Sequence, residues 1–190
     1  MPTVVNIEPT PNPNAIKYLL DAPLTGGESR SFPDVASAAA DPLAAALFAL
    51  PGVTSVFYMD RFVTINKTAE ASFHALHPRI MGAIEQGGTS PSMAASSPTI
   101  TAEPFIHLQN LSPEQQALME KINSVLDSDV RPALAGDGGG LVVMGLEGNL
   151  LKIKYQGACG SCPSSTAGTI AAIQNVLRFK VSPELSVVPA

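Results

Sequence analysis

Two cysteines, Cys159 and Cys162, are the residues whose type and spacing most clearly indicate chemistry, and they are the only cysteines among the 190 residues of the chain. They are separated by two residues in the segment GACGSCPSS. A C-x-x-C pair can bind a metal ion or an iron–sulfur cluster, act as a redox dithiol or form a disulfide, and it can also consist of two unrelated thiols. The elements around the pair and the number of ligands that each chemistry needs narrow this choice.

The pair is expected in a turn that follows a β-strand, residues 150–156, and precedes a helix beginning at Pro163. Free N–H groups and the positive dipole end at the start of a helix favour an anionic thiolate or a negatively charged metal–sulfide centre. Gly157 and Gly160 allow the chain to turn tightly around the sulfur atoms. Such a turn is a poor place for buried apolar sulfur, which makes two unrelated thiols the weakest interpretation.

The number of ligands is the main difficulty for a metal site, because structural zinc and iron–sulfur clusters usually have four ligands, mostly thiolates, and one chain has two cysteines. The three histidines do not complete the set, since His74 and His77 lie in a predicted helix of the first half and His107 lies just after a predicted linker. Two-fold symmetry is the simplest completion, with two chains each contributing a C-x-x-C pair to one shared centre. A site that disappears when the dimer separates suits a centre that is handed on better than a structural zinc ion.

Two alternatives to a shared cluster remain open. A thioredoxin-like dithiol oxidoreductase also presents C-x-x-C between a strand and a helix. Thioredoxin-like domains resemble one another in having further strands after that helix, one of them introduced by a cis-proline, whereas most of the 28 residues after Cys162 are predicted as helix. A zinc-bridged structural dimer is the second alternative, and metal analysis distinguishes it from an iron–sulfur protein.

Composition and charge argue against several other functions. The net charge is −5 and the 11 Lys and Arg residues are scattered, so we expect no binding to nucleic acid. The most apolar run, residues 42–53, is much shorter than the roughly 20 residues that span a bilayer, so we expect no membrane insertion. The first residues, MPTVVNIEPTPNP, lack the features of a signal peptide and of an Arg-rich presequence, which predicts a cytoplasmic protein. In a reducing compartment a disulfide between the cysteines is disfavoured.

The pattern of apolar residues, turns and caps predicts an α+β fold of two small domains, each with a β-sheet packed by helices. Residues 1–87 form the first domain, residues 88–104 a flexible linker rich in Gly, Ser, Thr and Pro, and residues 105–190 the second domain. In the first domain we expect strands at 3–8, 14–20, 53–59 and 61–67, a helix capped by Asp41, and a helix at 71–86 capped by Thr68 and disturbed by Pro78. In the second domain we expect a helix at 112–134 with a Ser112–Gln115 capping box and a bend at Pro132, a hairpin at 141–156, and a helix at 163–180.

At the residue level, the segment 131–165 closely resembles the C-terminal domain of NifU and the Nfu proteins. The family pattern R-P-x-L-x-x-D-G-G, a hairpin, and then G-A-C-x-x-C-P-S-S is present with every fixed element. The segments TPNPNAIKY and LFALPGVTSVFYMDRFVTINK are similar to the Nfu N-terminal domain. The resemblance covers nearly the whole chain apart from the linker.

The resemblance implies an iron–sulfur cluster scaffold or carrier and not an enzyme. In such a carrier Cys159 and Cys162 bind a 4Fe–4S cluster, with 2Fe–2S as the other form, bridged between the two subunits of a homodimer. The cluster is received from upstream assembly proteins and passed to client apo-proteins. Asp137 and residues 138–140, which match the family's D-G-G stretch, are expected to form a tight loop that enters the hairpin near the cysteine turn. The first domain has no cysteine, which leaves it a role in recognising clients or in holding the dimer.

Overall fold

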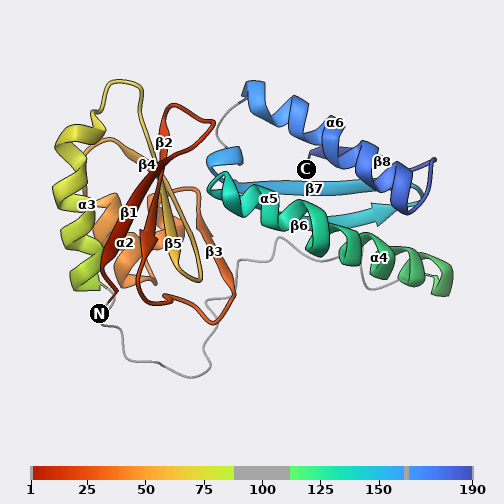
Figure 1. Ribbon diagram of the computed structural model, residues 1–190, viewed down its shortest axis with the longest axis horizontal. Helices are drawn as coiled ribbons and strands as arrows, with labels where there is room; N and C mark the ends of the chain where they lie inside the picture. The colour runs from red at the N-terminus through yellow and green to blue at the C-terminus, as the bar shows by residue number, and fades with distance from the viewer. Residues whose placement is uncertain (1, 88–111, 161–162, 190) are drawn as a thin grey trace. The chain divides into compact units, whose positions relative to one another are not determined.

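The computed structural model describes residues 2–87, 112–160 and 163–189 and divides into two compact units, Met1–Pro98 and Thr99–Ala190 (Figure 1). The predicted linker, residues 88–104, lies outside the described residues, so the exact domain boundaries stay a prediction. Sheets and helices in each unit confirm the α+β class. None of the described helices is both long and apolar enough to cross a membrane.

The first unit is an antiparallel sheet of five strands in the order β1-β2-β5-β4-β3, with its helices against one face (Figure 1). Alternation along the strands directs apolar side chains such as Tyr18, Val56 and Ile65 toward the helices, where they form one core with Leu47 and Ile80. The elements are β1 (Val4–Pro9), β2 (Ala15–Leu20), β3 (Ser29–Phe32), α1 (Val35–Ala38), α2 (Pro42–Phe48), β4 (Val53–Met59), β5 (Phe62–Lys67) and α3 (Phe73–Gly87).

Two details of this unit differ from the prediction. Helix α3 begins at Phe73, and Ser72 precedes it with a carbonyl that accepts the Leu76 N–H at 3.2 Å, so Thr68 does not cap the helix. Pro78 lies inside α3 without ending it, because the packing of the apolar face of α3 against the core outweighs one missing hydrogen bond. The short β3 and α1 were not predicted, since their residues carry no apolar alternation.

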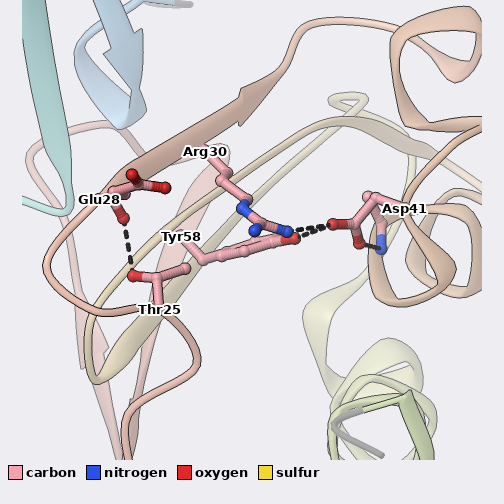
Figure 2. Close-up of polar contacts among 6 residues, drawn as sticks. Thr25, Glu28, Arg30, Asp41 and Tyr58 are labelled. Atoms are coloured by element: carbon pink, nitrogen blue, oxygen red, sulfur yellow. Dashed lines mark hydrogen bonds and ion pairs between the residues drawn. The ribbon is translucent and has the colours of Figure 1, made fainter. Parts of the chain in front are cut away.

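Asp41 begins α2 as predicted and also closes a polar network in the first unit. Its Oδ1 accepts the Ala44 N–H at 2.9 Å, and its Oδ2 accepts the Tyr58 hydroxyl and Arg30 Nη1, the latter at 3.1 Å. Figure 2 shows the Tyr58 and Arg30 side chains converging on this carboxylate. Asp41 is only 5% exposed, and its hydrogen bonds and ion pair offset the free-energy cost of burying its negative charge. The network joins the start of α2 to strands β3 and β4.

His77 on α3 is half-buried and its ring contacts the rings of Tyr18 and Phe73 in the first unit. Its Nδ1 lies 2.9 Å from the Tyr18 hydroxyl. Burial raises the pKa of Tyr18 above its ordinary value, and this hydrogen bond can form with a neutral imidazole at His77 in either tautomer. Burial, and to a lesser degree the neighbouring His74, lowers the pKa of His77, which favours the same neutral form. His77 therefore has its hydrogen-bond partner, Tyr18, within the first unit.

The second unit is a three-stranded sheet in the order β6-β7-β8, in which β6 and β7 form an antiparallel hairpin and β8 runs parallel to β7. Leu151 and Ile153 of β7 are fully buried against the helices, while Lys154 is exposed on the other face, as the alternation predicted. Gly148 has a φ of 58° in the hairpin turn, which is a conformation suited to glycine. The elements are α4 (Pro113–Val125), a π-helical turn (Leu126–Val130), α5 (Arg131–Gly136), β6 (Gly139–Glu147), β7 (Leu150–Gly157), a 3-10 turn (Ala158–Gly160), α6 (Pro163–Lys180) and β8 (Ser186–Pro189).

The single helix predicted for residues 112–134 is divided in the structure. Its capping box is confirmed, since Ser112 Oγ accepts the Gln115 N–H at 3.3 Å and Gln115 Oε1 accepts the Ser112 N–H at 3.1 Å. The π-helical turn separates α4 from α5 just before Pro132. Because proline has no N–H to continue a regular helix, the change of helix type at this point has a local cause.

Strand β8 was not predicted. Leu185 and Val187 are buried in the core of the second unit, and β8 is reached from β7 through helix α6. Most of the 28 residues after Cys162 are helix as predicted, since α6 takes 18 of them, and β8 adds one unpredicted strand of four residues. The argument from chain length against a thioredoxin-like domain is weakened by this one strand.

Candidate metal centre

The cysteine turn lies between the end of β7 and the start of α6, as predicted. Gly157, with a φ of 66°, ends β7, the 3-10 turn Ala158–Gly160 follows, and α6 begins at Pro163. The Ala158 N–H donates to the Gly138 carbonyl at 3.2 Å, and Ala158 is only 1% exposed. The turn is therefore attached to the loop that leads into β6. Cys162 lies outside the described residues, so its position relative to Cys159 stays a prediction.

The glycine at position 139 lies directly against Cys159. A Cβ atom placed on Gly139 would lie 2.7 Å from Cys159 Sγ, 3.2 Å from Cys159 Cβ and 2.9 Å from the Gln156 carbonyl oxygen. Since real Cβ atoms do not approach other heavy atoms so closely, the cysteine side chain takes the space that a side chain at position 139 would need. Gly139 pairs with Gly157 where β6 begins. The predicted tight loop close to the cysteine turn is confirmed for Asp137 and Gly138, whereas Gly139 and Gly140 are the first residues of β6.

Cys159 is partly buried and packs against the core of the second unit, as does Tyr155 of β7. A Cβ on Gly160 would lie 3.2 Å from the Tyr155 carbonyl oxygen, so the turn folds back onto the end of β7. The Tyr155 Oη is buried and has no hydrogen-bond partner among the described residues. Burial first, and then the nearby Cys159, raise the pKa of Tyr155 above its ordinary value.

The other residues considered as ligands do not join this site. His74 and His77 belong to α3 of the first unit, and His107 lies outside the described residues. Within the described ranges there is no group of three or more His, Cys, Asp or Glu side chains that could hold a metal ion. The described part of the site therefore offers one thiol at a strand-to-helix turn, and the sequence adds a second thiol three positions later.

Tyr155 was not identified as a site residue from the sequence. The alternation of β7 placed it on the helix-covered face, with Leu151 and Ile153, and this pattern indicated a core residue. Its closeness to Cys159 depends on how the turn folds back, which no local pattern encodes.

Models of two protein families match the two halves of the chain. The family described as "Scaffold protein Nfu/NifU N terminal" matches residues 5–90, and the family described as "NifU-like domain" matches residues 122–188. The first match covers the strands and helices of the first unit, and the second covers the hairpin, the cysteine turn and α6.

Several proteins that are similar to this chain over most of its length are named NFU1 iron-sulfur cluster scaffold homolog, mitochondrial. The protein from Drosophila erecta is 34% identical over 179 residues, which are 93% of this chain and 61% of the relative. The human protein is 34% identical over 178 residues, which are 93% of this chain and 68% of the relative. The chain thus spans about three fifths of the length of the Drosophila relative. A solved structure, the NifU-like protein from Saccharomyces cerevisiae, is 27% identical over 44% of this chain and 77% of its own, with a TM-score of 0.39, which is too weak a likeness to carry an argument.

These names contradict the prediction of a cytoplasmic protein, since the similar proteins are named as mitochondrial. The prediction rested on the first residues of the sequence, and those residues do not decide the compartment. The argument against a disulfide between the two cysteines assumed a cytoplasmic protein, so that argument no longer applies. Two family models match the chain, and a human relative is 34% identical over 93% of the chain. The chain therefore belongs to the Nfu/NifU family of iron–sulfur cluster scaffold proteins.

Proposed function

We propose that this chain is a carrier that binds a 4Fe–4S cluster between two copies of itself, through Cys159 and Cys162 of each copy, and passes the cluster to client apo-proteins. The observation that carries the proposal is the placement of Cys159 at a strand-to-helix turn, against Gly139. Membership of a family of iron–sulfur cluster scaffold proteins supports an iron–sulfur cluster as the group that the chain carries. In this proposal the protein holds and hands on its cargo and does not turn over a small substrate.

The stoichiometry of ligands supports a site shared by two chains. A 4Fe–4S cluster is held by four thiolates, and the sequence contains two cysteines. A two-fold axis between two cysteine turns would supply the other two thiolates without any further residue type. Helix α6 begins at Pro163, directly after the C-x-x-C pair, so its positive end would favour an anionic cluster bound by that pair.

Transfer to a client requires only ligand exchange. A thiolate of the client binds an iron atom and displaces a thiolate of the carrier, so the cluster changes hosts with no net oxidation or reduction. A partly buried cysteine at a turn can take part in such an exchange more readily than a ligand enclosed in a core. Clients and upstream assembly proteins are the partners that this mechanism needs.

Anaerobic reconstitution with iron and sulfide, followed by metal and sulfide analysis and by mass determination, tests the proposal. We expect about four iron and four sulfide per two chains, with a dimer that forms on loading. Zinc in place of iron would indicate the zinc-bridged dimer, a full cluster on a monomer would exclude the shared site, and disulfide reductase activity without bound iron would indicate the dithiol oxidoreductase.

Variants of the two cysteines identify the ligands. Cys159→Ala and Cys162→Ala should each abolish cluster retention while the apo-protein keeps its fold, measured by circular dichroism and thermal unfolding. Gly136→Ala is a suitable control, because a Cβ at this position at the end of α5 meets nothing within 4 Å. Normal cluster binding by either cysteine variant would show that the ligand assignment is wrong.

A further inference from the structure

Tyr155 and Cys159 lie next to each other on the helix-covered face of the second sheet. Tyr155 pairs with Leu141 across the hairpin, and Gly139 lies two residues before Leu141 on β6, on the same face. Cys159 Sγ takes the space of a side chain at position 139. Successive positions on one face of a strand are about 6.8 Å apart, so the tyrosine and the cysteine are neighbours along this face.

The hydroxyl of Tyr155 is the unusual feature of this neighbourhood. Its oxygen is buried and has no hydrogen-bond partner among the described residues. Burial without a partner destabilises a protein, and a phenylalanine would fill the same space without that cost. A buried donor on the same face of the sheet as the proposed cluster ligand therefore calls for an acceptor that the described residues do not provide.

We propose that the Tyr155 hydroxyl donates a hydrogen bond to a sulfur atom of the bound cluster and so stabilises the cluster on this chain. The inference rests on the proposed function, because it needs a cluster at Cys159. Sulfur atoms of an anionic cluster are good acceptors, and hydrogen bonds to them raise its reduction potential.

The test compares Tyr155→Phe with the wild type and with Thr64→Val as a matched control. Thr64 on β5 of the first unit has the other buried side-chain hydroxyl without a partner among the described residues, and that unit has no cysteine. Each variant removes one such hydroxyl with almost no change of volume. The full-length dimers are reconstituted anaerobically, and the reduction potential of the cluster and its rate of loss to an iron chelator are measured. The melting temperature of each apo-protein is recorded as well.

For Tyr155→Phe we expect an apo-protein at least as stable as the wild type, a shift of the cluster to a lower reduction potential, and roughly tenfold faster loss of iron, the low end for a hydrogen bond to a charged acceptor. For Thr64→Val we expect the same or higher apo stability with both cluster properties unchanged. A Tyr155→Phe protein whose cluster has the wild-type potential and the wild-type rate of loss would overturn the inference. A wild-type protein that takes up no iron and sulfide would instead refute the proposed function, so the two failures are distinct.

Discussion

Replacement of Gly139 by alanine should expel Cys159 from its place while leaving the rest of the second unit intact. Non-bonded heavy atoms pack at roughly 3.5–4.0 Å, whereas the new Cβ would lie 2.7 Å from Cys159 Sγ. The φ of Gly139 is not in the positive range, so alanine is compatible with the backbone and the effect is purely steric. The Gln156 carbonyl at 2.9 Å blocks movement of the methyl group to one side. The cysteine turn must therefore shift by about 1 Å, a distance set by the difference from normal packing.

The size of the effect follows from the cost of overpacking, which is about 1–3 kcal/mol for a methyl group inserted into a packed site in one chain. In the apo-protein the turn can relax by moving Cys159, whereas in the proposed cluster-loaded dimer both copies would have to keep the cysteine in place. The loaded form then loses about 2–6 kcal/mol, which weakens cluster retention by about 30-fold or more, since each 1.4 kcal/mol is a factor of ten.

Competition with an iron chelator measures this loss, and thermal unfolding of the apo-protein reports on the fold. Gly136→Ala is the matched control, because it adds the same methyl group three residues earlier, at a position where a Cβ meets nothing within 4 Å. We expect the control to retain its cluster like the wild type. If Gly139→Ala held its cluster as firmly as Gly136→Ala, the close approach of Gly139 and Cys159 would have no part in the site.

Two further predictions concern the first unit. Asp41→Ala removes a helix cap and leaves the Tyr58 hydroxyl without its acceptor, so we expect a loss of about 2–4 kcal/mol in the free energy of unfolding, measured by chemical denaturation. Asp34→Ala, which removes only the exposed cap of α1, should cost about 1 kcal/mol, and an equal loss in both variants would contradict the role of the network. The lowered pKa of His77 means that the unfolded chain binds its proton more readily, so the stability of the unit should fall as the pH drops below the unfolded value of 6.5. His77→Gln should flatten this dependence of the melting temperature on pH, and an unchanged slope would show that another group causes it.

Local signals account for the elements that were predicted correctly. The Asp41 cap, the Ser112–Gln115 capping box and the turn at Gly148 are each encoded within a few residues, and the structure confirms all three. Strand β8 was missed because it has four residues and owes its place to pairing with β7, far away in the sequence. The π-helical turn Leu126–Val130 was missed because a proline predicts a disturbance but not its form.

In the candidate site, too, features set by neighbouring residues were predictable, whereas contacts between residues far apart in the sequence were not predictable from local patterns. The turn around Cys159 follows from the strand before it and the helix after it, and both were predictable. The contact with Gly139 joins positions 20 residues apart and was anticipated only through the resemblance of the D-G-G stretch. The unpartnered hydroxyl of Tyr155 could not be predicted at all, because the absence of a partner depends on every side chain that packs around it.

The position of Cys159 is set by the sheet more than by the turn that carries it. Its sulfur takes the place of the side chain that Gly139 lacks, and the turn is held to the same loop by the hydrogen bond from Ala158 to Gly138. If Cys159 binds a cluster as proposed, a cysteine held in this way loses little conformational entropy on loading and regains little on release. Affinity then depends mainly on the bonds to iron and on hydrogen bonds to sulfur, such as the one proposed for Tyr155. For a carrier this balance is useful, because a client that offers equivalent thiolates can take the cluster without the carrier having to refold.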